Sequence, residues 1–254
     1  MDHSGKSLYD DARCYDLIMG KYATGPLLDF YHKQAVRIGE PVLELACGSG
    51  RLAVPLAQTG ITIAGLDISR HMLNMAELKA AERGVDIQFM QGDIRNFDLG
   101  RKFKFIFVAA QSLSHLHIRE EIEKCFQCVR RHLTEDGRFL VELHNPSLKL
   151  LSREAGHRYV VGEYKDQESD EQVILTEEVH YDAARQINYI VWYFGSDGDT
   201  AVKELSFEMR QFFPQEIDAL LVYNGFTIEE KYGDYDEAIF SSESPRQLIV
   251  CRAR

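Results

Sequence analysis

The chain has 254 residues, of which 45% are hydrophobic and 27% charged, and a formal net charge of -11. A chain of this length can bury a sizeable core without disulfides, and no apolar run approaches the roughly 18 residues of a membrane span. The first twenty residues lack the order of a basic end and an apolar stretch that a secretory signal has. Five cysteines are a sparse, odd set that fits reduced thiols. We therefore expect a cytoplasmic protein that binds neither a membrane nor, given its negative charge, nucleic acid.

Residues 10–40 carry apolar side chains at helical spacing, which predicts one or two helices before the first strand. From Pro41 to about Asn145, short apolar runs alternate with amphipathic stretches, and this alternation is typical of a parallel, doubly wound sheet. Ser69 is expected to cap a helix that Gly84 follows, and Gly137 is expected to end the helix before the strand at 137–143. The predicted strands are 41–46, 61–67, 86–91, 103–110 and 137–143, and the predicted helices are 51–58, 69–82 and 118–133.

The pattern changes after Pro146, because residues 173–181, 187–194 and 203–213 alternate in twos, as antiparallel strands do. A helix beginning at Pro214 and ending near Gly225 then leads to a last apolar strand at 247–253. The expected fold is α/β: a doubly wound sheet, mostly parallel with an antiparallel last strand, carrying a small antiparallel β insert as a cap. We divide the chain into an N-terminal helical lid (1–40), a core (41–155), the cap insert (156–212) and a completion of the core sheet (213–254).

The most specific motif is VLELACGSGR at 42–51, where an apolar strand leads through Gly48 and Gly50 directly into a helix. The glycines let a ligand approach the backbone, and the start of the helix offers free N–H groups. Gly48, Gly50 and Ala53 also satisfy the G-x-G-x-x-G/A fingerprint of dinucleotide-binding folds, with Asp67 downstream. The motif alone therefore leaves a nicotinamide-dependent oxidoreductase open.

Three acidic residues lie at or near the carboxyl ends of successive predicted strands: Glu44, Asp67 and Asp93. Open α/β sheets bind their ligands at this edge. A ribose diol needs an acceptor, which Asp67 supplies, and the exocyclic amine of adenine is a donor that suits Asp93. The three acids favour a nucleoside-containing ligand.

LELACGSG, GLDIS and QGDIRNF, in this order and spacing, resemble the motifs of class I S-adenosylmethionine-dependent methyltransferases, and the resemblance covers about residues 41–145. It implies a Rossmann-like core, S-adenosylmethionine as cofactor and S-adenosylhomocysteine as product. Ala46 stands where the family usually has glycine. The family pattern implies the following contacts: Glu44, Ala46, Gly48 and Gly50 around the methionine portion; Asp67 and Ile68 at the ribose and adenine edge; Asp93 and Ile94 at adenine; Arg51 and Met72 in the same pocket; Ala110, Gln111 and Ser112 between methyl group and substrate; Tyr15 and Tyr22 in a lid.

Methyl transfer from a sulfonium is an in-line displacement, so the protein mainly aligns two reactants and excludes water. An amine acceptor reacts unaided once it is neutral, whereas a hydroxyl acceptor benefits from a general base. His144, at the end of the fifth strand, is the candidate base, and Asn145 beside it is a candidate substrate contact. Trp192 in the aromatic-rich insert and Arg210 near the end of the insert are further substrate candidates. The lone C-x-x-C at Cys125 and Cys128 lacks a matched second pair, so we expect no metal.

These features favour a methyltransferase acting on a nitrogen or, less favourably, an oxygen of a small molecule, with the insert as acceptor pocket, dimer interface or both. An NAD(P)-dependent oxidoreductase is disfavoured because the chain has no Tyr-x-x-x-Lys pair and leaves Asp93 without a role. A nucleic-acid methyltransferase is disfavoured because AAQS follows the fourth strand instead of an NPPY-like element. A catalytically silent protein that binds S-adenosylmethionine remains open.

Overall fold

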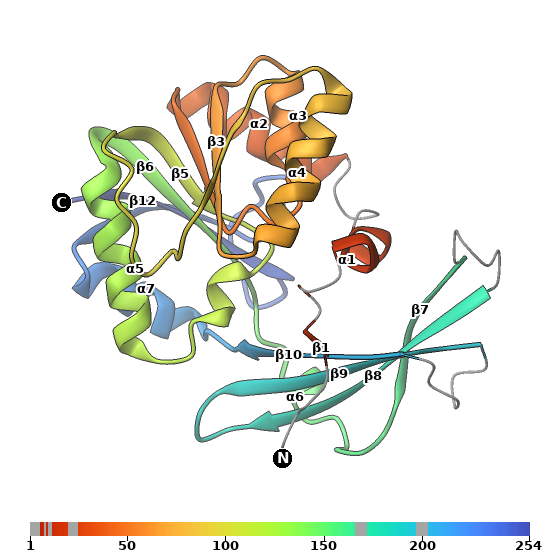
Figure 1. Ribbon diagram of the computed structural model, residues 1–254. Helices are drawn as coiled ribbons and strands as arrows, with labels where there is room; N and C mark the ends of the chain where they lie inside the picture. Colours follow the sequence, from red (N-terminus) through yellow and green to blue (C-terminus); the bar gives the residue numbers. More distant parts are fainter. Residues whose placement is uncertain (1–5, 8, 10–11, 20–24, 166–171, 197–202) are drawn as a thin grey trace.

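The computed structural model describes residues 6–7, 9, 12–19, 25–165, 172–196 and 203–254. Its larger sheet has seven strands in the order β11-β12-β6-β5-β2-β3-β4 (Figure 1). Neighbours from β4 to β6 run parallel, and β12 and β11 are antiparallel additions at one edge. The strands are β2 (Val42–Leu45), β3 (Ile63–Asp67), β4 (Gln88–Gln91), β5 (Phe103–Val108), β6 (Leu133–His144), β11 (Phe226–Tyr232) and β12 (Arg246–Ala253).

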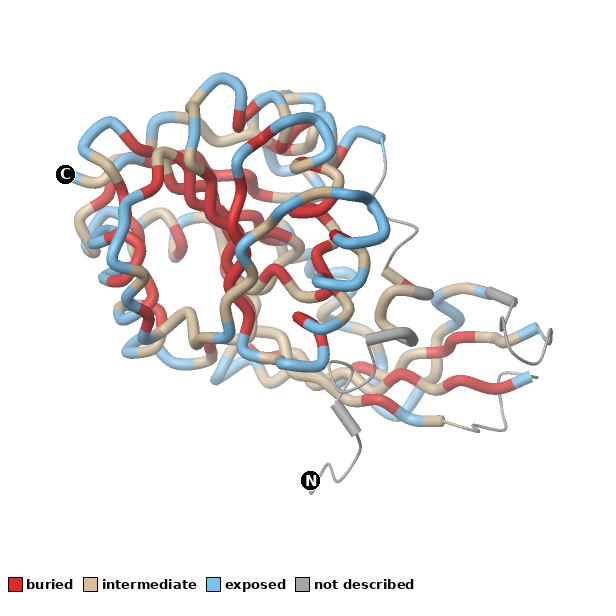
Figure 2. The backbone as a smooth tube through the Cα atoms, turned by 45° about the horizontal axis from the view of Figure 1, so that its top comes forward, coloured by how far each residue is buried: buried red, intermediate tan, exposed pale blue. Residues whose placement is uncertain are grey.

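Helices cover both faces of this sheet, as the alternating sequence pattern predicts. Helices α2 (Pro26–Ile38) and α3 (Ala53–Gln58) pack on one face, and α4 (Arg70–Arg83) lies beside α3 and β4. Helices α5 (Arg119–His132) and α7 (Pro214–Tyr223) pack on the other face. Figure 2 shows the buried residues concentrated in the strands between these layers. The strands are buried on both faces, which explains their continuous apolar runs.

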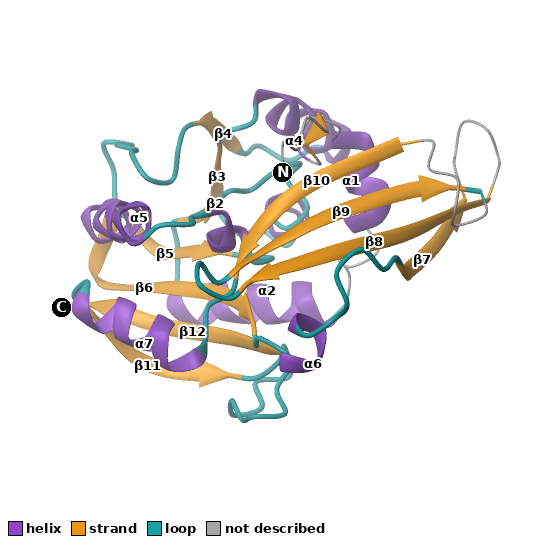
Figure 3. Ribbon diagram, turned by 90° about the horizontal axis from the view of Figure 1, so that it is seen from below, coloured by secondary structure: helices purple, strands orange, loops and turns teal. Residues whose placement is uncertain are grey.

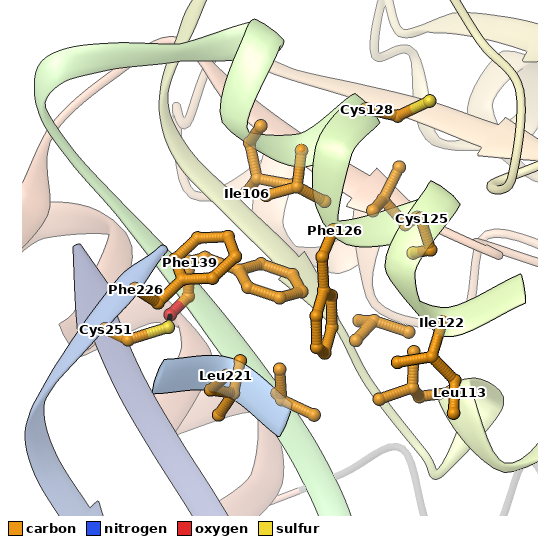
Figure 4. Packing of buried hydrophobic residues seen from close by; sticks show 14 of the residues in the cluster. Ile106, Leu113, Ile122, Cys125, Phe126, Cys128, Phe139, Leu221, Phe226 and Cys251 are labelled. Carbon is orange, nitrogen blue, oxygen red and sulfur yellow. Dashed lines mark hydrogen bonds between the residues drawn. The ribbon is translucent and has the colours of Figure 1, made fainter. Parts of the chain in front are cut away.

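Aromatic rings fill the layer under α5 and α7 (Figure 4). Phe126 of α5, Phe139 of β6 and Phe226 of β11 lie with their ring centroids 5.6–5.9 Å apart. The Cys251 thiol of β12 donates to the carbonyl of Phe139 at 3.4 Å. Cys47, Cys125, Cys128 and Cys251 are all buried and free. This packing joins the C-terminal hairpin firmly to the parallel strands.

The smaller sheet has the order β1-β10-β9-β8-β7, and it extends from the core beside α1 (Figure 3). Strands β7 (Tyr159–Lys165), β8 (Gln172–Asp182), β9 (Ile187–Gly195) and β10 (Lys203–Arg210) form an antiparallel meander, and α6 (Leu148–Leu151) precedes it. The predicted antiparallel insert is therefore confirmed. We call this sheet the cap sheet.

The N-terminal segment contributes more than the helices expected there. Helix α1 (Ala12–Met19) and α2 confirm two helices, whereas Tyr22 lies outside the described residues. Strand β1 (Lys6–Ser7) pairs in parallel with β10 at the edge of the cap sheet. A two-residue strand has no periodicity to detect, so the sequence did not predict it. Figure 1 shows α1 between α4 and the cap sheet.

Helix ends follow the predicted signals at two places and depart from them at a third. The Ser69 side chain accepts from the Met72 amide to cap α4, and Gly84 ends this helix in a left-handed conformation. The expectation that Gly137 ends the helix before β6 is wrong, because α5 already ends at His132 and Gly137 lies within β6. The register of β6 against β5 is irregular near Gly137, and a Cβ on Gly137 would lie 3.1 Å from the Lys104 carbonyl oxygen. Gly137 therefore accommodates a close backbone approach.

Among the described residues, no helix is long and apolar enough to span a membrane.

Candidate active site

In the sheet, β3 and β4 lie on one side of β2, whereas β5, the next strand along the chain, lies on the other side. The direction of strand addition therefore reverses between β2 and β5, and their carboxyl ends flank a topological switch point. Such points hold the ligands of open α/β sheets. A cavity of about 1620 Å³ opens there, between the strand ends, α1 and the cap sheet. The predicted site residues that line it are Tyr15, Ala46, Gly48, Asp67, Ile68, Met72, Asp93, Ile94, Ala110, Gln111, Ser112, His144, Asn145 and Trp192.

Asp67, at the end of β3, holds the glycine loop that follows β2. Its two carboxylate oxygens accept from the backbone N–H of Gly48 at 2.7 Å and of Ser69 at 2.8 Å. Burial raises the pKa of Asp67, while these backbone hydrogen bonds lower it. Each oxygen keeps a lone pair for a further donor, as a ribose diol requires. At Gly48, with φ +55°, a Cβ would meet nothing within 4 Å, so the open side of the loop admits a ligand close to the backbone.

Glu44 lies beneath this loop and does not line the cavity. Its side chain is buried, and Oε2 has no hydrogen-bond partner among the described residues. Burial raises the pKa of Glu44 to about 8, against the opposing influence of Arg51. Gly50 and Arg51 are also outside the lining. A buried acid with an unpaired oxygen beside a ligand loop fits a cationic group, such as the ammonium of a methionine moiety.

Asp93, after β4, lines the cavity with its carboxylate already bound by a neighbour. Arg95 donates from Nη2 to Oδ2 at 2.6 Å and from Nε to Oδ1 at 3.0 Å, and it also pairs with Glu121. This pairing lowers the pKa of Asp93. The predicted adenine contact therefore needs the lone pairs that Arg95 leaves unused.

The segment after β5 has strained backbone at the cavity wall. Ala110 and Gln111 have φ of +48° and +62°, which are unusual for non-glycine residues. The Ala110 N–H donates to Oε2 of buried Glu142, and the Gln111 side chain contacts Nε2 of His144. Desolvation lowers the pKa of His144. These contacts bring the predicted methyl-proximal residues beside the predicted base.

Helix α1 is held across the opening by polar contacts to the core. Asp16 accepts from Ser49 Oγ at 2.5 Å and pairs with Lys79 of α4 at 2.6 Å. Arg51 donates to the carbonyl of Met19. Burial raises the pKa of Tyr15, which lines the cavity from this helix. The action of α1 as a lid stays a prediction.

Tyr9 and His115 also line the cavity, and the sequence did not single them out as a pair. The Tyr9 hydroxyl lies 2.6 Å from Nε2 of His115, and burial lowers the pKa of His115 to about 4. His115 is therefore neutral near pH 7. The position of His115 shortly after the fourth strand of the core was a usable sequence signal for a residue at the strand ends.

The remaining substrate candidates differ in how freely they face the cavity. Trp192 lines the cavity from β9, whereas the side-chain amide of Asn145 donates hydrogen bonds to the carbonyls of Ser242 and Ser244. Arg210 is outside the lining: it donates to Glu216 and to the carbonyl of His117. Contact of Arg210 with a substrate stays a prediction.

Comparisons with known proteins agree with this geometry. Residues 42–137 match the family model described as methyltransferase domain. A protein named as a methyltransferase in Geobacillus sp. (strain WCH70) is 26% identical, covering 94% of this chain and 96% of that one. The dTDP-3-amino-3,6-dideoxy-alpha-D-glucopyranose N,N-dimethyltransferase of Streptomyces fradiae is 32% identical, covering 56% of this chain and 54% of that one.

The crystal structure of an S-adenosylmethionine-dependent methyltransferase from Clostridium acetobutylicum ATCC 824 has the same fold, with a TM-score of 0.77, 22% identity, and coverage of 95% of this chain and 97% of that one. The family match lies on the segment that carries the glycine loop, Asp67 and Asp93. Residues 42–137 therefore carry a methyltransferase domain, and together with the fold and the cavity at the strand ends these findings support a class I S-adenosylmethionine-dependent methyltransferase.

Proposed function

We propose that this enzyme transfers the methyl group of S-adenosylmethionine to a nitrogen of a small-molecule acceptor. One observation carries the proposal: a single cavity extends from Gly48 and Asp67 at the strand ends to Trp192 and Phe207 on the cap sheet. A cofactor at the strand ends and an acceptor on the cap sheet then share one cavity. The volume of about 1620 Å³ accommodates two small molecules together.

In this proposal the chain works mainly by binding and alignment. S-adenosylmethionine supplies an electrophilic methyl group when it is bound. Asp67 orients the ribose, and Tyr15 covers the site from α1. Glu44, which lies outside the cavity lining, attracts the charged methionine end from beneath the Gly48 loop. Ala110, Gln111 and Ser112 form the wall beside the methyl group. Alignment and exclusion of water of this kind are worth up to about 7–11 kcal/mol of the barrier.

The titratable groups of the cavity favour a nitrogen acceptor over an oxygen acceptor. A hydroxyl needs a base whose pKa lies near the working pH. Burial lowers the pKa of His115 to about 4 and also lowers that of His144, so each imidazole is a weaker base than a histidine in water. A neutral amine needs no base. The relative from Streptomyces fradiae is named for dimethylation at nitrogen, which supports the same choice.

A radiometric assay tests this proposal. The enzyme is supplied with tritiated S-adenosylmethionine and with amine and alcohol pairs of matched shape, cyclohexylamine against cyclohexanol and benzylamine against benzyl alcohol. We expect label in the amines. Preferential labelling of the alcohols contradicts nitrogen transfer, and tight cofactor binding without any transfer indicates a silent binding protein.

The variant His144→Gln separates the two acceptor chemistries further, with His157→Gln on the exposed surface as its control. If no base is used, kcat of His144→Gln stays within about tenfold of the parent enzyme. A general base would cost about 10²- to 10⁴-fold on its removal. A loss of kcat of that size in His144→Gln overturns the proposal that the reaction needs no base.

A further inference from the structure

One face of the cap sheet forms a wall of the cavity, and its composition is uneven. The register pairs Glu177 with Trp192, Val179 with Ile190, and Tyr181 with Asn188 across β8 and β9. Because side chains alternate between faces, these pairs and the facing residues of β10 share one side of the sheet. Its cavity-lining residues are mostly apolar: Val179, Ile190, Trp192, Phe207 and Met209.

Glu177 and Asn188 are the polar residues that this face contributes to the lining. Glu177 has partners, because Arg153 donates to Oε1 at 2.6 Å and Trp192 Nε1 lies 3.4 Å from Oε2. Asn188 does not: within the described part of the chain, its amide oxygen is shielded from water and accepts no hydrogen bond. An amide oxygen left unpaired in this way costs free energy that a ligand donor would recover.

Asn188 lies at the end of the cap sheet that joins the strand ends of the core. It pairs with Met209 of β10, and the chain continues from there to Gln211, which also lines the cavity. The next carbonyl, that of Phe212, accepts from Gln247 Nε2, which also donates to the carbonyl of His144. The strand that pairs with Asn188 therefore leads to a segment that Gln247 joins to the end of β6 by two hydrogen bonds.

We propose that Asn188 selects the acceptor: an amine whose apolar ring or chain packs on Val179, Ile190 and Phe207, and which carries a hydroxyl that hydrogen-bonds the Asn188 amide. The terminal torsion of an asparagine is soft, so a small rotation presents the amide to the cavity. An acceptor without the hydroxyl leaves the amide unpaired and is used less well, by on the order of ten- to a hundredfold. This inference rests on the proposed amine methylation.

The test compares cyclohexylamine with the trans-2-, 3- and 4-aminocyclohexanols as acceptors of tritiated methyl groups. We expect at least one aminocyclohexanol to exceed cyclohexylamine tenfold or more in kcat/KM. Asn188→Leu, which replaces the amide by an apolar side chain of similar size, brings that ratio to about one. Asn188→Asp keeps an oxygen and retains the preference. Tyr189→Phe, the next residue on the opposite face, is the matched control and leaves the ratio unchanged.

Equal use of all four amines by the parent enzyme, or an unchanged ratio in Asn188→Leu, overturns the assignment of Asn188 while amine methylation stands. Cofactor binding without methylation of any amine overturns the proposed function, and with it this inference. Melting temperatures of the variants distinguish loss of selectivity from loss of folding, because replacing an unpaired amide by leucine is not expected to lower stability.

Discussion

The backbone N–H of Ala110 donates to Oε2 of Glu142 at 3.2 Å, and the same buried carboxylate receives the hydroxyls of Tyr31 and Tyr235 at 2.7 and 2.6 Å. Glu142 lies two residues before the end of β6, with only 4% of its surface exposed. It thereby connects α2 and the loop after β11 to the segment at Ala110 and Gln111. The positive φ angles of that segment are held by this network.

Glu142→Gln tests this role. The amide places an NH₂ group among three donors, so we expect the free energy of unfolding to fall by about 1–3 kcal/mol. We also expect kcat to fall at least tenfold, because the methyl-proximal wall loses its support. Glu135→Gln, exposed on the same strand, is the control. Wild-type stability in Glu142→Gln, measured by urea unfolding, contradicts the network.

Ala46→Gly is expected to be tolerated or mildly stabilising. Ala46 has φ +52°, a left-handed conformation that costs an alanine roughly 1–2 kcal/mol and a glycine almost nothing. The greater entropy of glycine in the unfolded chain offsets about 0.4–1 kcal/mol of this gain. Ala81→Gly, in the regular helix α4, should instead lose about 0.5–1 kcal/mol. Equal losses in thermal unfolding of the two variants would show that the conformation at Ala46 is misassigned.

Cofactor binding near pH 7 should release protons through Glu44. Its ordinary pKa is 4.5 and its pKa in the folded protein is about 8, so it is protonated between these values only when the chain is folded. The stability that this proton contributes is complete below about pH 4.5 and is lost as the pH rises through about 8. A cationic ligand group favours the ionised acid, which releases the proton on binding.

Calorimetric titration with S-adenosylmethionine in phosphate and in Tris at pH 7 measures this release, because the two buffers differ in ionisation enthalpy. We expect a heat that depends on the buffer for the parent enzyme and for the surface control Glu82→Gln. Glu44→Gln should lose the dependence. Identical heats in both buffers for the parent enzyme would remove Glu44 from the cofactor site.

The sequence predicted the core well because its signals are local. Continuous apolar runs identify strands that are buried on both faces, and Gly48 marks a turn that requires positive φ. Asp67 and Asp93 were identifiable because Asp67 ends one predicted strand and Asp93 lies two residues after the next. The cap sheet was visible through its two-residue alternation in β8, β9 and β10.

The parts that were missed depend on contacts between distant residues. Tyr9 and His115 are separated by 106 positions, and only the fold brings their side chains together. Glu142 is an isolated acid within an apolar strand of the sequence, and its role arises from its contacts with Tyr31 and Tyr235. Asn188 has no motif at all. Its importance follows from the surrounding apolar face and from the absence of a partner within the described residues.

Calorimetric titration of the parent enzyme and of Asp67→Ala with S-adenosylmethionine, S-adenosylhomocysteine and NADH tests the central claim most directly. We expect the two adenosyl compounds to bind the parent enzyme and NADH not to bind. Asp67→Ala should weaken the binding of both adenosyl compounds by at least tenfold, because Asp67 holds the Gly48 loop and faces the cavity. Asp86→Ala, on the surface, should leave their binding unchanged. Binding of NADH alone, or unchanged affinity in Asp67→Ala, would contradict the account of this site.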